Sequence, residues 1–425
     1  MGRMPDATGA GGATGAPAVR PPSYRALLEV PTLPRALAGT QLARIAGSML
    51  GVAIVLFSLA EYGSPSLAGL ITFVGIFPGL VVSPIAGALL DRHGRTRLIA
   101  LDFLVAMAAM LLIGCLALLD RLELPIVFAI AGLASLTGPL SNTGLRTLFP
   151  LIVPRPLWER LNAVDSNGWV IASIVGPPIA AIAVGVVGGA WTLILVGLLF
   201  GAAAWVVAGV PEPPATSDAT GGHLLRDALA GLRYAWSNRT IRGLGLSVSL
   251  VNVTGGIVSI VIPLLVLDRL GLGEPVVGLL FAVQGVAGVT VGFLAGRLDT
   301  RGRERLLVAI PILGFAPATA LLFGAELPLL VLSMALAGML VAPMDVAMFT
   351  IRQRRTDPAW LGRAFAVSMA LNFSGYPIGA AVGGALAAIS VELAIGVAVV
   401  MPVVAGISAL TMIPARATEY DPAVA

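Results

Sequence analysis

Long apolar segments alternate with short polar loops along almost the whole chain. From residue 36 onward, twelve of these segments are close to the length of about 20 residues that an α-helix needs to cross the hydrocarbon core of a bilayer. This pattern predicts an all-α membrane protein with twelve transmembrane helices. The predicted spans are 36–60, 65–90, 98–119, 125–148, 162–186, 188–210, 244–267, 275–296, 306–324, 327–351, 362–389 and 393–414.

One long polar break divides the twelve spans into two sets of six. It begins with the turn-rich stretch PEPPATSDATGG and continues as a short amphipathic helix, Leu224 to Trp236. The residues before the first span are rich in Gly, Ala and Pro and have no periodicity, which is typical of disorder. The predicted order is a disordered cytoplasmic tail (1–23), an N-terminal six-helix bundle (24–210), a cytoplasmic linker (211–243), a C-terminal six-helix bundle (244–415) and a second cytoplasmic tail (416–425).

An arginine-rich motif occurs once in each half of the chain. DRHGRTR, which begins at Asp91, lies between the second and third spans, and its variant DTRGRER, which begins at Asp299, lies between the eighth and ninth. A longer stretch also repeats, since GPPIAAIAVG from Gly176 resembles GYPIGAAVGG from Gly375. Such duplication predicts two halves built on one plan, with a binding site between them near the middle of the membrane.

The arginines set the predicted orientation. All 26 basic residues are arginine, and all but Arg44, Arg121 and Arg269 fall in loops, tails and span ends on the side that carries both termini. Because arginine-rich loops stay on the cytoplasmic side, both termini are predicted to be cytoplasmic. The net charge of +4 then reflects topology, and we expect no nucleic-acid partner.

Composition excludes several other classes of protein. Only 11% of the residues are charged and the mean hydropathy is +0.96, whereas soluble domains are about 25% charged. The chain has no lysine and therefore no Walker motif, which argues against ATP-driven transport by this chain alone. Its one cysteine, Cys115, and two histidines, His93 and His223, predict no metal site or cofactor. No catalytic constellation occurs in the spans, so we do not expect an enzyme.

Charged groups inside the spans are the best functional candidates, because one at a helix centre costs roughly 2.5–3.5 kcal/mol. Asp345 lies six residues before the end of the tenth span and Arg44 lies in the first third of the first span. The alternatives are a structural carboxylate at Asp345 and an arginine that snorkels to the interface at Arg44. Asp102 and Asp165, at the starts of spans, are expected to cap helices. The neutral polar candidates for substrate binding or coupling are Gln41, Ser48, Asn142, Asn252, Gln284 and Asn372.

Several of these stretches resemble a known family. GALLDRHGRTR, from Gly87, resembles the signature loop between helices 2 and 3 of major facilitator superfamily transporters. LRTLFPLIVPRPLWERLNA, IVGPPIA and AWLGRAFAVSMALNFSGYPIGAAVGG are similar to the branch of drug and siderophore exporters related to the enterobactin and macrolide efflux proteins. The resemblance covers roughly residues 24–415. It implies the major facilitator fold, two pseudo-symmetric six-helix bundles, and we expect a monomer in a bacterial inner membrane.

The resemblance assigns a gating role to the arginine-rich loop. Its aspartate, here Asp91, is implied to engage the cytoplasmic start of helix 11 near Gly362, where the helix dipole stabilises an exposed carboxylate by about 0.3–1 kcal/mol. The alternative is that the loop only anchors the topology at phospholipid headgroups. The candidate gating residues are Gly87, Asp91, Arg92, Gly94, Arg95, Arg97, Asp299, Gly302 and Arg303.

The family arrangement also implies which helices line the pathway. Helices 1, 4, 7 and 10 are implied to surround a central cavity, where Asp345 and Arg44 would compensate one another. Helices 2, 5, 8 and 11 are implied to form the seam between the halves, and glycines spaced four residues apart let such helices approach closely. The candidate helix-packing residues are Gly176, Pro177, Gly375, Pro377, Gly379 and Gly383.

Taken together, these features and the resemblance predict a secondary active transporter that exports small amphipathic compounds by alternating access. Coupling to protons is implied by the resemblance alone. Two departures from the family weaken the coupling: Ser48 stands where the branch often has an acid, and the fourth span lacks the RxxxQG-type element. One alternative is an importer or uniporter of a polar metabolite, which would need more aromatic and amide residues in helices 1, 4, 7 and 10. Another is a non-transporting scaffold or sensor, which an extra soluble module would favour. The expected partners are the substrate, protons and membrane lipid.

Overall fold

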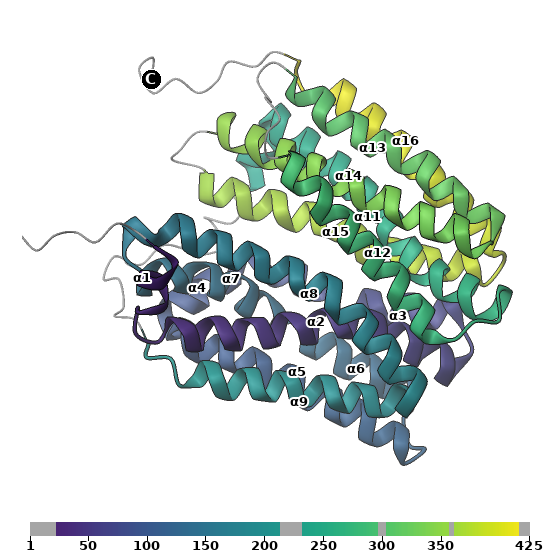
Figure 1. The fold of residues 1–425 in the computed structure, drawn as a ribbon, viewed down its shortest axis with the longest axis horizontal. Coiled ribbons are helices and arrows are strands. Elements are labelled where there is room, and N and C mark those ends of the chain that lie inside the picture. The colour runs from purple at the N-terminus through teal and green to yellow at the C-terminus, as the bar shows by residue number, and fades with distance from the viewer. Residues whose placement is uncertain (1–22, 213–231, 296–302, 357–360, 416–425) are drawn as a thin grey trace, which may run out of the picture.

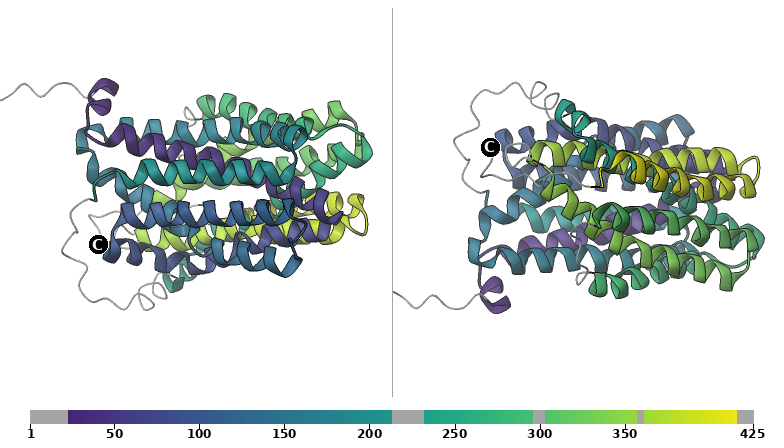
Figure 2. Two further views of the ribbon diagram at one scale, coloured as in Figure 1. Left: turned by 90° about the horizontal axis from the view of Figure 1, so that it is seen from below. Right: turned by 90° about the horizontal axis from the view of Figure 1, so that it is seen from above.

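The fold is known from a computed structural model, which describes residues 23–212, 232–295, 303–356 and 361–415. All regular secondary structure in these residues is helical, and the long helices run side by side (Figure 1, Figure 2). The N-terminal half contains α1 (Tyr24–Leu28), α2 (Leu33–Tyr62), α3 (Pro65–Val74), α4 (Phe77–His93), α5 (Arg95–Leu118), α6 (Leu124–Ser135), α7 (Gly138–Ile152), η1 (Arg155–Leu157), α8 (Trp158–Val187) and α9 (Gly189–Ala208). The C-terminal half contains α11 (Arg239–Leu264), η2 (Leu265–Arg269), α12 (Glu274–Ala295), α13 (Glu304–Ala320), η3 (Leu321–Gly324), α14 (Leu327–Arg354), α15 (Leu361–Ala387) and α16 (Val391–Met412).

Eleven described segments are long and apolar enough to cross a membrane. The second span is divided into α3 and α4, and the fourth into α6 and α7, because Pro78 and Pro139 open each new helix and cannot donate to the turn before. The one predicted span that is not among these eleven is α15, the eleventh along the chain, which has 27 residues and packs against α11 and α3. Its polar and helix-breaking residues, Asn372, Tyr376 and Pro377, lower its hydropathy. The predicted twelve-helix fold is therefore confirmed.

The helices form two bundles that meet along a seam (Figure 1). The seam pairs α3 with α15 and α8 with α12, which are the second, eleventh, fifth and eighth spans, as predicted. Gly69 of α3 lies against the backbone of Ala380 and Gly384, and Gly278 of α12 lies against Pro177 of α8. Small side chains at these points allow the backbones of the two halves to touch.

The glycine face of α15 lies elsewhere than at the seam. Gly375, Gly379 and Gly383 face Ser249, Val253 and Ile257 of α11, inside the C-terminal half. They let the seventh and eleventh spans approach closely, so that α15 presents these three glycines to its own half and presents Ala380 and Gly384 to the other. A glycine spacing in the sequence predicts a close-packing face but does not say which neighbour it meets.

We expect Gly379→Ala to destabilise the protein. An added Cβ would overlap the backbone of Val253 and force α11 and α15 apart, at a cost of about 1–3 kcal/mol for an overpacked interface. The midpoint of thermal unfolding in detergent measures the effect. Gly396→Ala in α16 is the matched control, because a Cβ there meets nothing within 4 Å. Equal midpoints for the two variants would contradict the close contact.

The two halves contact one another closely at one end of the bundle and separate toward the other. We call the end at which α2 begins and α16 finishes the terminal end (Figure 1). At the opposite end the Ser66 hydroxyl of α3 donates to the Gly384 carbonyl of α15 at 3.4 Å, and Gly185 of α8 lies beside Glu274 and Pro275 of α12. Toward the terminal end the helices of the two halves diverge in Figure 1.

Candidate functional site

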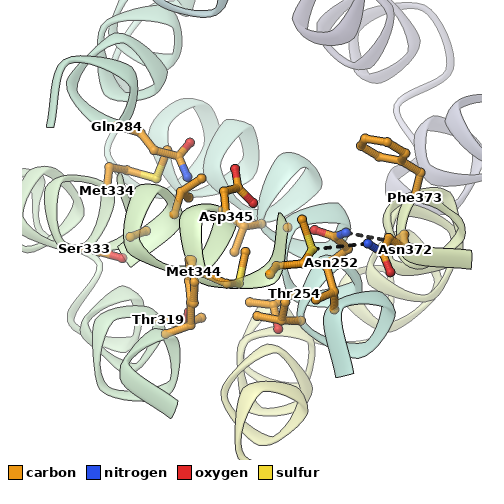
Figure 3. Close-up of a pocket in the computed structure, with 18 of the residues that line it drawn as sticks. Asn252, Thr254, Gln284, Thr319, Ser333, Met334, Met344, Asp345, Asn372 and Phe373 are labelled. Atoms are coloured by element: carbon orange, nitrogen blue, oxygen red, sulfur yellow. Dashed lines mark hydrogen bonds between the residues drawn. The ribbon is translucent and has the colours of Figure 1, made fainter. Parts of the chain in front are cut away.

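A cavity of about 280 Å³ lies within the C-terminal half, among α11, α12, α13, α14 and α15 (Figure 3). Most of its lining is apolar, and sulfur and aromatic side chains dominate. Methionine is unbranched and polarisable, so a methionine-rich wall adapts to ligands of different shape. The sulfur and aromatic side chains of the cavity wall are Met334, Met344, Met348, Met369, Phe315, Phe349 and Phe373.

Asp345 is the one charged side chain among the described residues that line this cavity. It is only half-buried, so its carboxylate is reached from the cavity. Figure 3 shows it projecting from α14 between Gln284 of α12 and Asn252 of α11. Four of the eight candidate residues for substrate binding or coupling therefore share one cavity: Asp345, Asn252, Gln284 and Asn372. Their functional role remains a prediction.

A buried polar network stands behind Asp345. The Asn252 amide donates to the Asn372 backbone carbonyl at 2.8 Å and so joins α11 to α15. With its side-chain oxygen turned toward Arg352, Asn372 accepts from Arg352 Nη2 at 2.8 Å and donates to the Ser368 carbonyl at 3.0 Å. Arg352 is fully buried and lies within electrostatic reach of Asp345. The carboxylate thus has a fixed positive charge nearby.

Arg44 pairs with Asp165, and the predicted compensation of Arg44 by Asp345 is wrong. Arg44 Nη2 lies 2.7 Å from Asp165 Oδ1, and Nη1 donates to the Asp165 carbonyl at 2.8 Å. The guanidinium also lies 4.9 Å from the centre of the Trp169 ring. Because Gly168 has no side chain, Arg44 can lie flat on α8 of its own half. Arg44 is 8% exposed, so the snorkelling alternative does not apply either.

The other three candidates belong to the N-terminal half. Gln41 donates to the Gly168 carbonyl at 3.1 Å, one turn before Arg44 on α2. Ser48 packs against Gly176 of α8, which is the close helix approach expected for that glycine. Asn142 lies exposed near the start of α7 and donates to Gly138 of the same helix at 3.1 Å. None of these three lines the cavity around Asp345.

Asp102 lies at the break in the fourth span, away from the start of its own helix. It is 5% exposed on α5. Its carboxylate interacts with the hydroxyls of Thr137 and Ser141 and with the Ser141 backbone N–H. These groups surround the start of α7, where a negative charge meets the positive end of the helix dipole. Asp102 therefore stabilises α7 and leaves its own helix α5 uncapped.

The loop between α4 and α5 is held by a residue that follows the end of α9. Glu212 accepts from the Arg95 and Arg97 backbone N–H groups at 2.6 and 3.3 Å. Gly94 has a φ of +96°, and a Cβ there would lie 2.9 Å from the Glu212 carboxylate, so the contact requires glycine. The Arg95 guanidinium reaches the Thr147 hydroxyl of α7 at 3.2 Å. A residue of the predicted linker thus supplies the missing cap of α5.

For the remaining candidate gating residues, the structure describes fewer contacts or none. Arg92 and Arg97 are exposed, and Arg303 is the exposed residue before α13. Gly87 and Asp91 belong to α4, but the surroundings of their side chains lie outside what the structure describes, as does the start of α15 near Gly362. Asp299 and Gly302 lie outside the described residues. The latch between Asp91 and helix 11 therefore stays a prediction.

We expect Glu212→Gln to loosen the first turn of α5. A neutral amide accepts the two backbone hydrogen bonds more weakly than a carboxylate and loses the attraction of the helix dipole, and a lost cap costs about 0.5–2 kcal/mol. Hydrogen exchange of the amides of residues 95–97 measures the change. Glu326→Gln at the start of α14 is the control, because Glu326 makes no side-chain cap bond. Unchanged exchange in Glu212→Gln would refute the capping role.

Three residues of these clusters were not predicted from the sequence. Arg352 was assigned to a span end, although it follows Asp345 by seven residues and therefore shares its helix face. Arg146 is exposed on α7, four residues after Asn142, and acts electrostatically on Arg44. Trp169 follows Asp165 by one turn. In each case the helical spacing was the available signal.

The described residues contain no group of three or more side chains that could hold a metal ion.

Comparison with known proteins agrees with the resemblance. The sequence profile of the Major Facilitator Superfamily matches residues 36–272 and 244–423. An uncharacterized MFS-type transporter y4rN of Sinorhizobium fredii is 38% identical over 397 residues, which are 92% of this chain and 97% of that protein. The multidrug efflux pump Tap of Mycolicibacterium fortuitum is 27% identical, over 80% of this chain and 86% of Tap. The enterobactin exporter EntS of Shigella boydii is 27% identical, over 81% of this chain and 83% of EntS.

The fold agrees with solved structures as well. The crystal structure of the nucleoside transporter NupG superposes with a TM-score of 0.70 and 12% identity, covering 90% of this chain and 98% of that one. At this identity the likeness shows the fold alone. The profile match and the extent of identity to y4rN, however, cover both bundles. The chain is a multi-pass membrane transporter and belongs to the Major Facilitator Superfamily.

Proposed function

We propose that this protein exports small amphipathic compounds across a bacterial inner membrane by alternating access of its two halves. The observation that carries the proposal is the cavity around Asp345, in which one carboxylate faces a wall of methionine and phenylalanine. Such a wall accepts apolar bodies of varied shape, and a few polar groups orient them. The exporters among the relatives support the direction of transport. The cavity is complete within one chain, which supports a monomer.

The contacts between the halves support alternating access. The closest contacts named above lie at the end opposite the terminal end, where Gly69 meets Ala380 and Gly185 meets Glu274. With both termini in the cytoplasm, this arrangement presents the cavity to the cytoplasmic side. An exporter loads its substrate from that side. Separation of α3 from α15 and of α8 from α12 would then release the substrate outside.

Proton coupling rests in this proposal on Asp345. A carboxylate that lines a largely apolar cavity can exchange a proton with the side to which the cavity opens, and its charge then changes the binding of a substrate there. The protein would use a proton gradient to drive efflux. In this proposal, the arginine-rich loop that contains Asp91 holds the two halves together when the pathway is closed on the cytoplasmic side.

Proteoliposomes that contain the purified protein test the function. We expect at least one of three fluorescent amphipathic dyes (cationic, neutral or anionic) to be moved against its concentration gradient when a pH gradient is imposed. Nigericin, which collapses the pH gradient, removes this transport. Failure of all three dyes to move, or movement that nigericin leaves unchanged, would refute gradient-driven export. Faster movement of a polar nucleoside than of any dye would instead support the importer.

Reporter fusions test the orientation. We expect a reporter after residue 215 to report the cytoplasm, and reporters near Leu122 and Leu272 to report the outside, because of the arginine distribution. Residue 215 follows α9, whereas Leu122 and Leu272 lie in the loops after α5 and η2. A cytoplasmic signal at Leu122 would overturn the proposed topology.

A further inference from the structure

Helix α8 has two exposed faces of opposite character. It packs on α2 through Gly168 and Gly176, and on α12 through Pro177 and Ala181. The residues left exposed between these contacts fall on two stripes with helical spacing. One stripe is apolar after its first exposed member, Asn167 (Ile171, Val175, Ile179 and Ile182), and the other is polar or amphipathic throughout (Asn162, Ser166, Trp169 and Ser173). The apolar stripe suits lipid, so the polar stripe faces the interior between the halves.

Positive charge gathers beside this polar stripe. Arg44 lies 4.9 Å from the Trp169 ring centre and pairs with Asp165. Arg146 of α7 is exposed and close enough to Arg44 to act on it electrostatically. Two arginines and one aspartate leave one positive charge in excess. Neither a hydrogen bond nor an ion pair reaches the Arg146 side chain from any described residue.

The cluster also keeps unused binding capacity. Arg44 Nε is buried and has no hydrogen-bond partner among the described residues, which is costly unless a ligand or water completes it. The Trp169 side chain is 44% exposed although it stacks on a cation. An exposed indole ring offers a flat apolar surface, and the neighbouring guanidinium groups offer donors for an anion.

We propose that Arg146, Arg44 and Trp169 form an anion subsite on the N-terminal wall of the pathway, which binds amphipathic substrates that carry an aromatic body and a negatively charged group. The aromatic body lies against the exposed part of Trp169 and the anion lies against Arg146, and the buried Arg44 guanidinium behind Trp169 adds positive charge to the site. This subsite is separate from the cavity around Asp345, and it narrows the substrate class of the transporter on whose proposed function it rests.

Matched probes of opposite charge test the subsite. Naphthalene-2-sulfonate and 2-naphthylmethylammonium share an aromatic body, and calorimetric titration of the purified protein in nanodiscs measures the affinity for each. We expect the wild-type protein to prefer the sulfonate by about tenfold or more, as for a charge-assisted contact. Arg146→Gln should remove the preference and Arg146→Lys should keep most of it. Trp169→Leu should weaken both probes.

Arg121→Gln, at the opposite end of the N-terminal half, is the control that removes one arginine without touching the cluster. It should leave the affinity for both probes unchanged. The inference is overturned if the wild-type protein binds neither probe or prefers the ammonium, or if Arg146→Gln leaves the preference intact. It is also overturned if Arg121→Gln removes the preference equally, because the effect would then reflect overall charge.

This design distinguishes a failure of the proposed transport from a failure of the proposed anion subsite. If the sulfonate binds with the expected dependence on Arg146 but is never exchanged across a proteoliposome membrane, the subsite stands and the proposed transport of such anions fails. If cationic or neutral dyes are exported while the sulfonate shows no preference, the exporter stands and the anion subsite fails.

Discussion

Replacement of Asp345 by asparagine is expected to reduce pH-gradient-driven efflux to background. Asparagine has nearly the same volume and still fits between Gln284 and Asn252, but it cannot carry the charge or exchange the proton. Downhill exchange of substrate should remain measurable, because the apolar wall of methionine and phenylalanine is unchanged. Parallel assays of gradient-driven efflux and of counterflow in proteoliposomes measure the two activities.

Two controls make this result specific. Glu326→Gln removes an exposed carboxylate from the start of the same helix, far from the cavity, and should leave both activities intact. The unfolding midpoint of Asp345→Asn shows whether a lost activity comes from lost folding. Full gradient-driven efflux in a stable Asp345→Asn protein would make this carboxylate structural, and the coupling would have to use another group.

The fold was predictable from the sequence because the bilayer imposes strong local requirements. A membrane helix must be about 20 residues long and largely apolar, so span number and length can be read from the pattern. The span that became α15, which is not among the eleven most apolar segments, was still predicted as an apolar segment of spanning length, 362–389. The breaks within the second and fourth spans were not predicted, although Pro78 and Pro139 mark both.

The charge pairs were not predictable in the same way. Asp345 and Arg44 were correctly singled out as charges within spans, but they do not pair with one another. Arg352 acts electrostatically on Asp345, and Arg44 forms a salt bridge with Asp165. Arg352 shares a helix face with Asp345 and was overlooked because it stands at the end of its span. Asp165 was assigned to a helix cap, yet Gly168 lets Arg44 reach it. Pairing depends on which helix faces touch, and a single sequence does not contain that information.

The Glu212 contact illustrates the same limit. Its sequence context, PEPPATSDATGG, predicts a linker, and α9 indeed ends shortly before it. No local pattern indicates that this carboxylate folds back onto a loop more than a hundred residues earlier in the chain. The loop itself was identified by its own motif, DRHGRTR. Contacts between two recognisable motifs are decided by the packing of α5 and α9, which only the structure supplies.

Breaking the Arg44–Asp165 pair is expected to destabilise the protein strongly. The two side chains are 7% and 22% exposed and lie 2.7 Å apart, so Arg44→Gln leaves a carboxylate largely out of solvent without its cation. Loss of one partner from a buried pair costs about 3–5 kcal/mol. Arg25→Gln is the matched control, because Arg25 forms an ion pair with Glu29 in which the side chains are 90% and 50% exposed. That variant should unfold like the wild-type protein.

A double-mutant cycle then decides which acid Arg44 serves. We expect Arg44→Gln and Asp165→Asn to be strongly non-additive in the free energy of unfolding, because the second change removes the group that the first leaves unpaired. Arg44→Gln and Asp345→Asn should add to within about 0.5 kcal/mol, as independent sites do. Chemical unfolding in detergent measures the single and double variants. Strong coupling between Arg44 and Asp345 would reinstate the ion pair across the pathway, and additivity of Arg44 with Asp165 would remove the salt bridge as a source of stability in the N-terminal half.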